Sequence, residues 1–134
     1  MIVADTSWIA ALRDPLDAHH QAAVAVEHII GSEDVLVATV TLAECLVAPA
    51  KLDCLEEAEA ALRSAFDIDT VDHTAPGRWA SRRAMTGLRL PDAIVLETAL
   101  YSRARAVATF DQRLADACRA AGIAVLGHAR SHET

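Results

Sequence analysis

Short apolar runs recur along the chain, separated by longer segments in which apolar residues return every three or four positions. Residues 67–72 alternate between apolar and polar side chains, which is typical of a half-exposed strand. Four other runs are apolar except for the closing Thr109, as in strands buried on both faces of a parallel sheet, and lie at residues 2–4, 35–38, 107–109 and 124–126. The longer segments predict helices over residues 6–13, 17–30, 39–47, 52–66, 75–85, 91–104 and 111–121.

Strands and helices alternate from end to end. This order predicts a three-layer α/β/α sandwich around a mostly parallel sheet of about five strands. No internal repeat, low-complexity tract or linker interrupts the pattern. We therefore expect a single domain over residues 1–134, in which the polar segment 127–134 forms a loose tail.

Several of the predicted helix ends carry recognisable signals. Asp17 is a suitable N-cap for the second helix, and Gly31 is suited to the position just after its end. The third helix is expected to stop before Pro49, because a proline has no N–H to donate inside a helix. Pro91 is expected at the first position of its helix, where that N–H is not needed.

The composition describes a globular chain and excludes a disordered one, because 53% of the residues are apolar and 23% are charged. No apolar run approaches the ~18 residues of a membrane span, and no basic leader precedes the first strand. The three cysteines never form a CxxC pair, so we expect a reduced, cytoplasmic protein. The net charge of −7 argues against a general nucleic-acid coat. A local contact with nucleic acid stays open, since residues 68–134 hold nine of the 12 basic residues.

Four carboxylates stand at predicted helix starts, and each has an ordinary structural explanation. Asp5 and Asp111 are placed to cap the helices that follow them. Glu44 completes a capping box with Thr41, and Asp92 lies in a first helical turn, where the helix dipole favours negative charge. For each residue alone, the structural explanation is the more common one.

Taken together, the four acids indicate a site. Asp5, Glu44 and Asp111 each follow a short apolar strand, and the strand-to-helix turns of a parallel sheet all lie at one edge. The hydroxyls of Ser7 and Thr109 are expected beside them. Like charges packed together require a proton or a cation. Oxygen ligands without paired cysteines or histidines favour Mg²⁺ or Mn²⁺ over zinc.

The acidic motifs resemble those of PIN-domain nucleases, and their length, order and spacing are most similar to the VapC toxins of VapBC toxin–antitoxin systems. The four motifs in this order are more specific than any one of them, and they span nearly the whole chain. They are Met1-Ile-Val-Ala-Asp5-Thr6-Ser7, Thr-x-x-Glu44, Leu90-Pro91-Asp92-Ala93 and Ala108-Thr109-Phe110-Asp111.

This resemblance implies Mg²⁺-dependent cleavage of RNA phosphodiester bonds, with Mn²⁺ as a substitute. Asp5, Asp92 and Asp111 would hold metal, and Glu44 would orient the attacking water or accept its proton. Thr6, Ser7 and Thr109 would be neighbouring polar groups. Many relatives have another acidic or polar residue just after the last motif. Here Gln112-Arg113-Leu114 follows Asp111, and whether Asp116 contributes stays open.

The resemblance also implies an antitoxin partner that presents a basic side chain to the acids. Apolar faces on the helices over 17–30 and 52–66 predict a homodimer. The arginines just before Asp92 are placed either to contact RNA phosphates or to form a solvated helix face, and they are Arg78, Arg82, Arg83 and Arg89.

Other functions are compatible with parts of the pattern. A PIN fold used only to bind protein and a stand-alone metal-dependent nuclease are the main alternatives. A haloacid-type phosphatase needs a second Asp where Ser7 stands, and an adhesion module needs a Ser where Ile9 stands. The six histidines, among them the adjacent His19 and His20, form no metal-ligand pattern.

Overall fold

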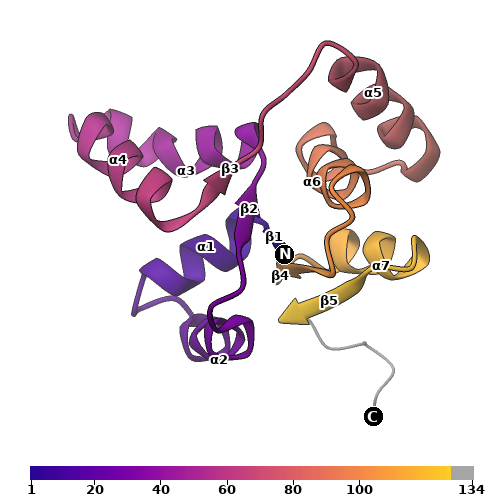
Figure 1. Ribbon diagram of the computed structural model, residues 1–134. Coiled ribbons are helices and arrows are strands. Elements are labelled where there is room, and N and C mark those ends of the chain that lie inside the picture. Colours follow the sequence, from indigo (N-terminus) through magenta and orange to yellow (C-terminus); the bar gives the residue numbers. More distant parts are fainter. Residues whose placement is uncertain (128–134) are drawn as a thin grey trace.

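A computed structural model describes residues 1–127 of the chain (Figure 1). The strands are β1 (Ile2–Ala4), β2 (Val35–Val37), β3 (Asp67–Ile68), β4 (Ala106–Thr109) and β5 (Ala124–Gly127). The helices are α1 (Thr6–Arg13), α2 (His20–Ile30), α3 (Thr39–Lys51), α4 (Leu55–Ala65), α5 (Ala75–Thr86), α6 (Leu90–Tyr101) and α7 (Gln112–Ala120). Gly127, the first residue of the predicted tail, ends β5, and the rest of that tail lies outside the described residues.

The strands form one parallel sheet in the order β3-β2-β1-β4-β5. Strand β1 is central, and Val3 pairs with Leu36 of β2 on one side and Val107 of β4 on the other. The predicted α/β/α fold with a five-stranded parallel sheet is therefore confirmed. Because every strand runs in the same direction, the strand-to-helix turns share one edge of the sheet.

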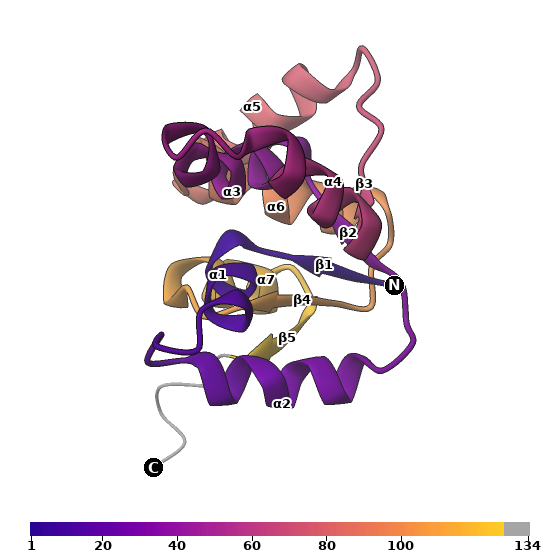
Figure 2. The same ribbon diagram turned by 90° about the vertical axis from the view of Figure 1, so that its left-hand side faces the viewer.

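Alternate side chains of the central strands enter two different cores. Ile2 and Ala4 belong to a cluster with residues of α1, α2, α3 and α4, whereas Val3 belongs to a cluster with residues of α6 and α7. Helix α5 packs against α6, and the two views agree on this arrangement (Figures 1 and 2). Burial on both faces explains why these strands read as unbroken apolar runs. Within residues 1–127, no helix combines the length and apolar character needed to cross a membrane.

Two predicted helix ends were wrong. Asp17 does not cap α2, because its Oδ1 accepts the backbone N–H of His19 at 2.8 Å in a tight turn, and His19 becomes the N-cap. Helix α3 does not stop before Pro49 but continues through it to Lys51. Pro49 lies in the last turns of this helix, and its carbonyl accepts the N–H groups of Leu52 and Cys54, which helps to close the helix end.

Other boundaries shift by a few residues, and helix α4 begins at Leu55 instead of residue 52. Strand β3 spans only Asp67–Ile68, because it is an edge strand whose sole partner, β2, ends at Val37. Helix α6 begins at Leu90, so Pro91 occupies its second position, not the first. It ends at Tyr101, before Arg103 takes a positive φ of 57°, a conformation outside the helical region.

Candidate active site

Asp5 is anchored at the carboxyl end of the sheet. It directly follows β1, and its backbone N–H donates to the carbonyl of Ala108 in β4 at 3.0 Å. Its Oδ2 accepts hydrogen bonds from Thr109 Oγ1 and from Ser7 Oγ, both at 2.8 Å. Its side chain makes no capping bond to α1, so the structural explanation for this acid fails. With 5% of its surface exposed, Asp5 is buried in a fixed orientation.

The hydroxyls of Ser7 and Thr109 link Asp5 to the segment that follows β4. They lie 3.2 Å apart. The backbone N–H of Phe110 donates to Ser7 Oγ at 2.9 Å, and that of Asp111 donates to Thr109 Oγ1 at 3.0 Å. The two strand ends are thus joined by side-chain hydrogen bonds as well as by the sheet.

Asp92 is coupled to the other two aspartates through its charge. It is 9% exposed in the first turn of α6. Burial raises the pKa of Asp92, and the nearby charges of Asp111 and Asp5 raise it further, whereas Arg89 opposes the rise. The structure therefore brings these three predicted site residues, from three different segments, close enough for the charges of Asp5 and Asp111 to act on Asp92.

Asp111 has the structural role that its position suggested. Its Oδ1 accepts the backbone N–H of Leu114 at 2.9 Å and so caps α7. The residue is partly buried, and the cap holds its carboxylate at the end of β4. One side chain thus starts a helix and also adds charge to the acidic cluster.

Glu44 reaches the site from α3, and the predicted capping box is wrong. Helix α3 is preceded by Ala38 at its N-cap, and Thr41 lies inside the helix. Thr41 Oγ1 is buried and has no hydrogen-bond partner among the described residues. Glu44 Oε1 instead accepts a hydrogen bond from Thr6 Oγ1 at 2.7 Å, which ties this acid to the segment next to Asp5.

An apolar pocket of about 320 Å³ adjoins the Thr6–Glu44 contact. Helices α1, α3 and α4 supply its walls, which include Ile9, Pro49 and Leu62. Of the predicted site residues, Thr6 and Glu44 belong to the lining of this pocket.

The family is identified by a match over most of the chain. A protein-family model for the PIN domain matches residues 2–120. The chain belongs to the PIN domain family.

Several solved structures share this fold. One is a toxin–antitoxin complex from Klebsiella pneumoniae, with 23% identity, a TM-score of 0.71, and coverage of 86% of this chain and 90% of that chain. Another is VapC20 from Mycobacterium tuberculosis, a sarcin-ricin loop cleaving toxin, with 21% identity, a TM-score of 0.67, and coverage of 92% and 96%. A third is FitAB bound to an IR36 DNA fragment, with 25% identity, a TM-score of 0.72, and coverage of 99% and 100%. No curated protein matches the chain.

The donor set of this PIN domain fits a hydrated divalent cation better than a closed ligand cage. In residues 1–127, no three His, Cys, Asp or Glu side chains are arranged to hold a metal ion together. Asp5, Asp92 and Asp111 nevertheless offer oxygen atoms and unfavourable like charge, which a cation relieves. Mg²⁺ is usually held by one or two carboxylates, with water and substrate phosphate completing its shell. The residues present fit that mode of binding.

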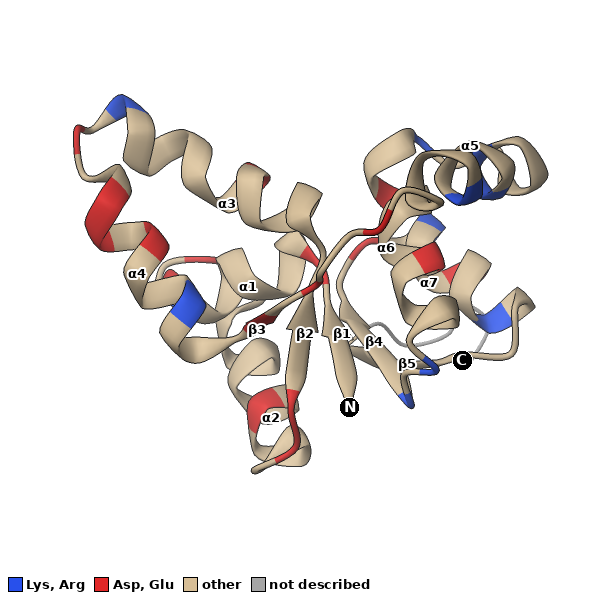
Figure 3. Ribbon diagram, turned by 45° about the horizontal axis from the view of Figure 1, so that its top comes forward, with Lys and Arg blue, Asp and Glu red and all other residues tan. Residues whose placement is uncertain are grey.

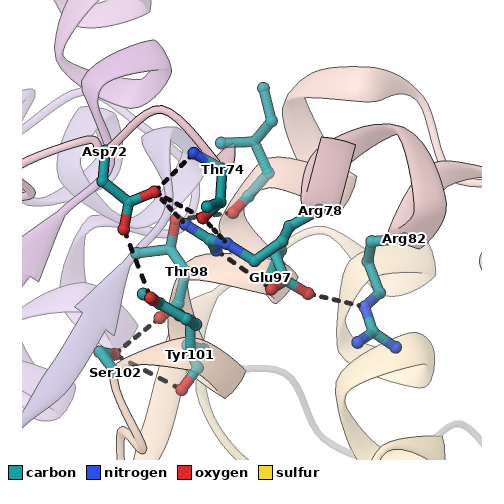
Figure 4. A network of polar contacts seen from close by, with 10 residues as sticks. Asp72, Thr74, Arg78, Arg82, Glu97, Thr98, Tyr101 and Ser102 are labelled. Atoms are coloured by element: carbon teal, nitrogen blue, oxygen red, sulfur yellow. Dashed lines mark hydrogen bonds and ion pairs between the residues drawn. The ribbon is translucent and has the colours of Figure 1, made fainter. Parts of the chain in front are cut away.

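The predicted RNA-contacting arginines divide into two groups. Arg78 and Arg82 both pair with the buried Glu97 of α6, at 3.2 and 3.0 Å (Figure 4). Arg78 also lies 3.6 Å from the ring centroid of Tyr101. These two guanidiniums hold α5 against α6.

The other two arginines make contacts in the segment that leads into Asp92. Arg83 donates to the backbone carbonyl of Leu88, which fixes the loop before α6. Arg89 has a side chain that is 74% exposed, with its Nε 3.6 Å from Asp92 Oδ2. Of the four arginines, Arg89 is therefore the one whose position beside the acids suits contact with a bound phosphate.

Residues that the sequence analysis passed over support this arrangement. Glu97 is an acid that follows the apolar residues 93–96 of α6. A single charged residue within such a segment could have predicted a buried ion pair. The backbone N–H of Phe110 has no sequence signal, because its bond to Ser7 depends on the pairing of β1 with β4. Asp116, which the motif left open, is exposed on α7 and faces Arg119 at 3.8 Å.

Proposed function

We propose that this PIN domain is a Mg²⁺-dependent RNA endonuclease, with Mn²⁺ as a substitute, and that it acts as the toxin of a type II toxin–antitoxin system. The observation that supports the proposal is that Asp5, Asp92 and Asp111 lie close together at the carboxyl edge of the sheet. There the charges of Asp111 and Asp5 raise the pKa of Asp92. Such crowding is unfavourable unless a cation is bound, and a divalent cation on carboxylates is a common device for cleaving phosphodiesters.

Each acidic residue has a role in this proposal. Asp5, held by two hydroxyls, and Asp92 would ligate the cation, with Asp111 as the third metal-associated acid. When bound, the cation would polarise a phosphoryl oxygen and supply hydroxide from a bound water. Glu44 would orient that water or accept its proton, because its carboxylate is held by Thr6 at the border of the site. Arg89 would contact the backbone of the RNA substrate.

The proposed protein partner is a cognate antitoxin with a basic segment. The first half of the chain is acidic, and Figure 3 shows acidic residues on α2 and α4, while α5 carries arginines. A guanidinium placed among the carboxylates would neutralise them as a cation does. Antitoxin binding would then compete with metal, and the complex would be inactive.

A homodimer in the cytoplasm completes the proposal. Ile29 on α2 is 63% exposed and Leu55 on α4 is 41% exposed, so both helices that were expected to carry surplus apolar surface do so. Burial of such patches against a second copy is the commonest closed solution. Light scattering of the purified protein gives its mass and tests this part directly.

The test of the enzymatic proposal is cleavage of RNA by the purified chain. Wild-type protein should cut RNA in Mg²⁺ or Mn²⁺, EDTA should stop the reaction, and Asp5→Asn or Asp92→Asn should lower the rate by at least about a hundredfold, because metal-assisted attack is lost. Asp116→Asn is the matched control and should cleave like wild type. Cleavage that persists in both site variants would refute the proposal. A chain that binds the antitoxin but neither metal nor RNA would be a protein-binding module.

A further inference from the structure

Two aromatic rings are stacked beside the acidic site, and neither has a role in the proposed chemistry. The imidazole of His19, at the start of α2, lies 4.8 Å from the ring of Phe110, centroid to centroid, with the two planes inclined by 11°. Phe110 is the residue between Thr109 and Asp111. Its backbone N–H donates to Ser7 Oγ, and the same hydroxyl donates to Asp5 Oδ2. The stack is therefore two hydrogen bonds away from Asp5.

The stack is held on both sides. Beneath Phe110 lies Gly127 of β5, where a Cβ atom would come within 3.1 Å of Phe110 Cε1 and 2.8 Å of the carbonyl oxygen of Thr109. The glycine therefore leaves the space that the phenyl ring needs. On the other side, the backbone of His19 is fixed by its own hydrogen bonds, since its N–H donates to Asp17 Oδ1 and its carbonyl accepts from Ala23.

Within residues 1–127, the outer ring of the stack is exposed. Phe110 is partly buried, whereas His19 is exposed, although one face of its ring is covered by Phe110. The exposed surface of a stacked imidazole is flat and aromatic. Proteins that recognise single-stranded nucleic acid place such rings where unpaired bases can stack on them.

We propose that His19, supported by Phe110, stacks on an unpaired base of the RNA next to the scissile phosphate. This inference rests on the proposed function and deepens it, since it selects single-stranded segments or loops as the substrate. The bases of a duplex are stacked on one another and are not available to the ring. His19 is thus a substrate-binding residue that takes no part in bond cleavage.

Binding is measured separately from cleavage to test this. Full-length protein carrying Asp92→Asn is titrated in Mg²⁺ into a short single-stranded RNA that contains one 2-aminopurine, whose fluorescence is quenched by stacking. His19→Ala and His19→Leu should weaken binding about tenfold and remove most of the quenching, the size expected when one base loses its stacking partner. His19→Trp should restore both. His28→Ala, a change at an exposed histidine of the same helix, should have no effect.

The His19→Leu variant separates stacking from simple packing, because leucine covers Phe110 but offers no aromatic face. Unchanged affinity and quenching in His19→Leu, or no RNA binding by the parent protein, would overturn the inference. An equal loss of affinity for a duplex of the same sequence would also overturn it.

The two proposals fail in different ways. If the wild-type protein never cleaves RNA but quenching still depends on His19, the stacking site is supported and the nuclease proposal is rejected. Normal cleavage and normal binding in His19→Ala would reject only the stacking site.

Discussion

Replacing Glu97 with glutamine tests whether the arginines of α5 hold the fold together. Glu97 accepts one ion pair from Arg78 and another from Arg82, and its side chain is 8% exposed. Hydrogen bonds to charged groups contribute roughly 1.5–3 kcal/mol each, and breaking a fully buried pair costs roughly 3–5 kcal/mol. The two arginine side chains are 24% and 25% exposed, so each recovers part of its hydration when the carboxylate is lost.

We therefore expect Glu97→Gln to lower the free energy of unfolding by about 2 kcal/mol, with a fall in Tm of roughly 8 °C for a chain of this length. Urea denaturation and thermal melts measure the two quantities. The matched control is Glu59→Gln, which removes an exposed pair with Arg63 at 2.9 Å and should cost less than about 0.5 kcal/mol. Equal losses in the two variants would refute the reasoning from burial. Combining Glu97→Gln with Arg82→Gln should cost less than the sum of the single changes.

Two further predictions concern buried polar groups. Asp92→Asn should stabilise the metal-free protein at pH 7. The raised pKa of Asp92 means that the folded state binds a proton more tightly than the unfolded state. The stability of the wild type therefore falls as the pH rises from about 4 through that pKa. The gain should vanish near pH 3 in urea titrations, and a gain of the same size at both pH values would contradict the proposed cause. Thr41→Val should leave stability unchanged or raise it by up to about 1 kcal/mol, because the buried hydroxyl has no partner within residues 1–127. A loss of more than about 1 kcal/mol in thermal melts would indicate that the hydroxyl forms a hydrogen bond.

The sheet and its acidic edge were predictable because the signals for them are local. Ile2-Val3-Ala4 is apolar at every position, since its side chains enter two cores, and the first polar residue after it is Asp5. The same pattern places Asp111 after β4. Parallel pairing then brings the two acids to one edge with no further information.

The features that sequence reasoning missed depend on competition between nearby groups or on distant partners. Asp17 has a side chain suited to capping, but a turn bond to His19 takes the same oxygen. Glu44 has the spacing of a capping box, yet the helix starts earlier and its carboxylate binds Thr6, 38 positions away. The stack of His19 on Phe110 is created only when the chain between α1 and α2 folds against the end of β4.

The central claim is that Asp5 and its neighbouring carboxylates bind a divalent cation, and calorimetric titration of Mn²⁺ into the purified chain tests it most directly. Wild-type protein should bind the ion, Asp5→Asn should weaken binding by at least about tenfold, and Asp116→Asn, a change at an exposed acid on α7, should bind like wild type. Equal Mn²⁺ affinity in all three proteins would contradict the account, because the cation would then be held somewhere other than the carboxyl edge of the sheet.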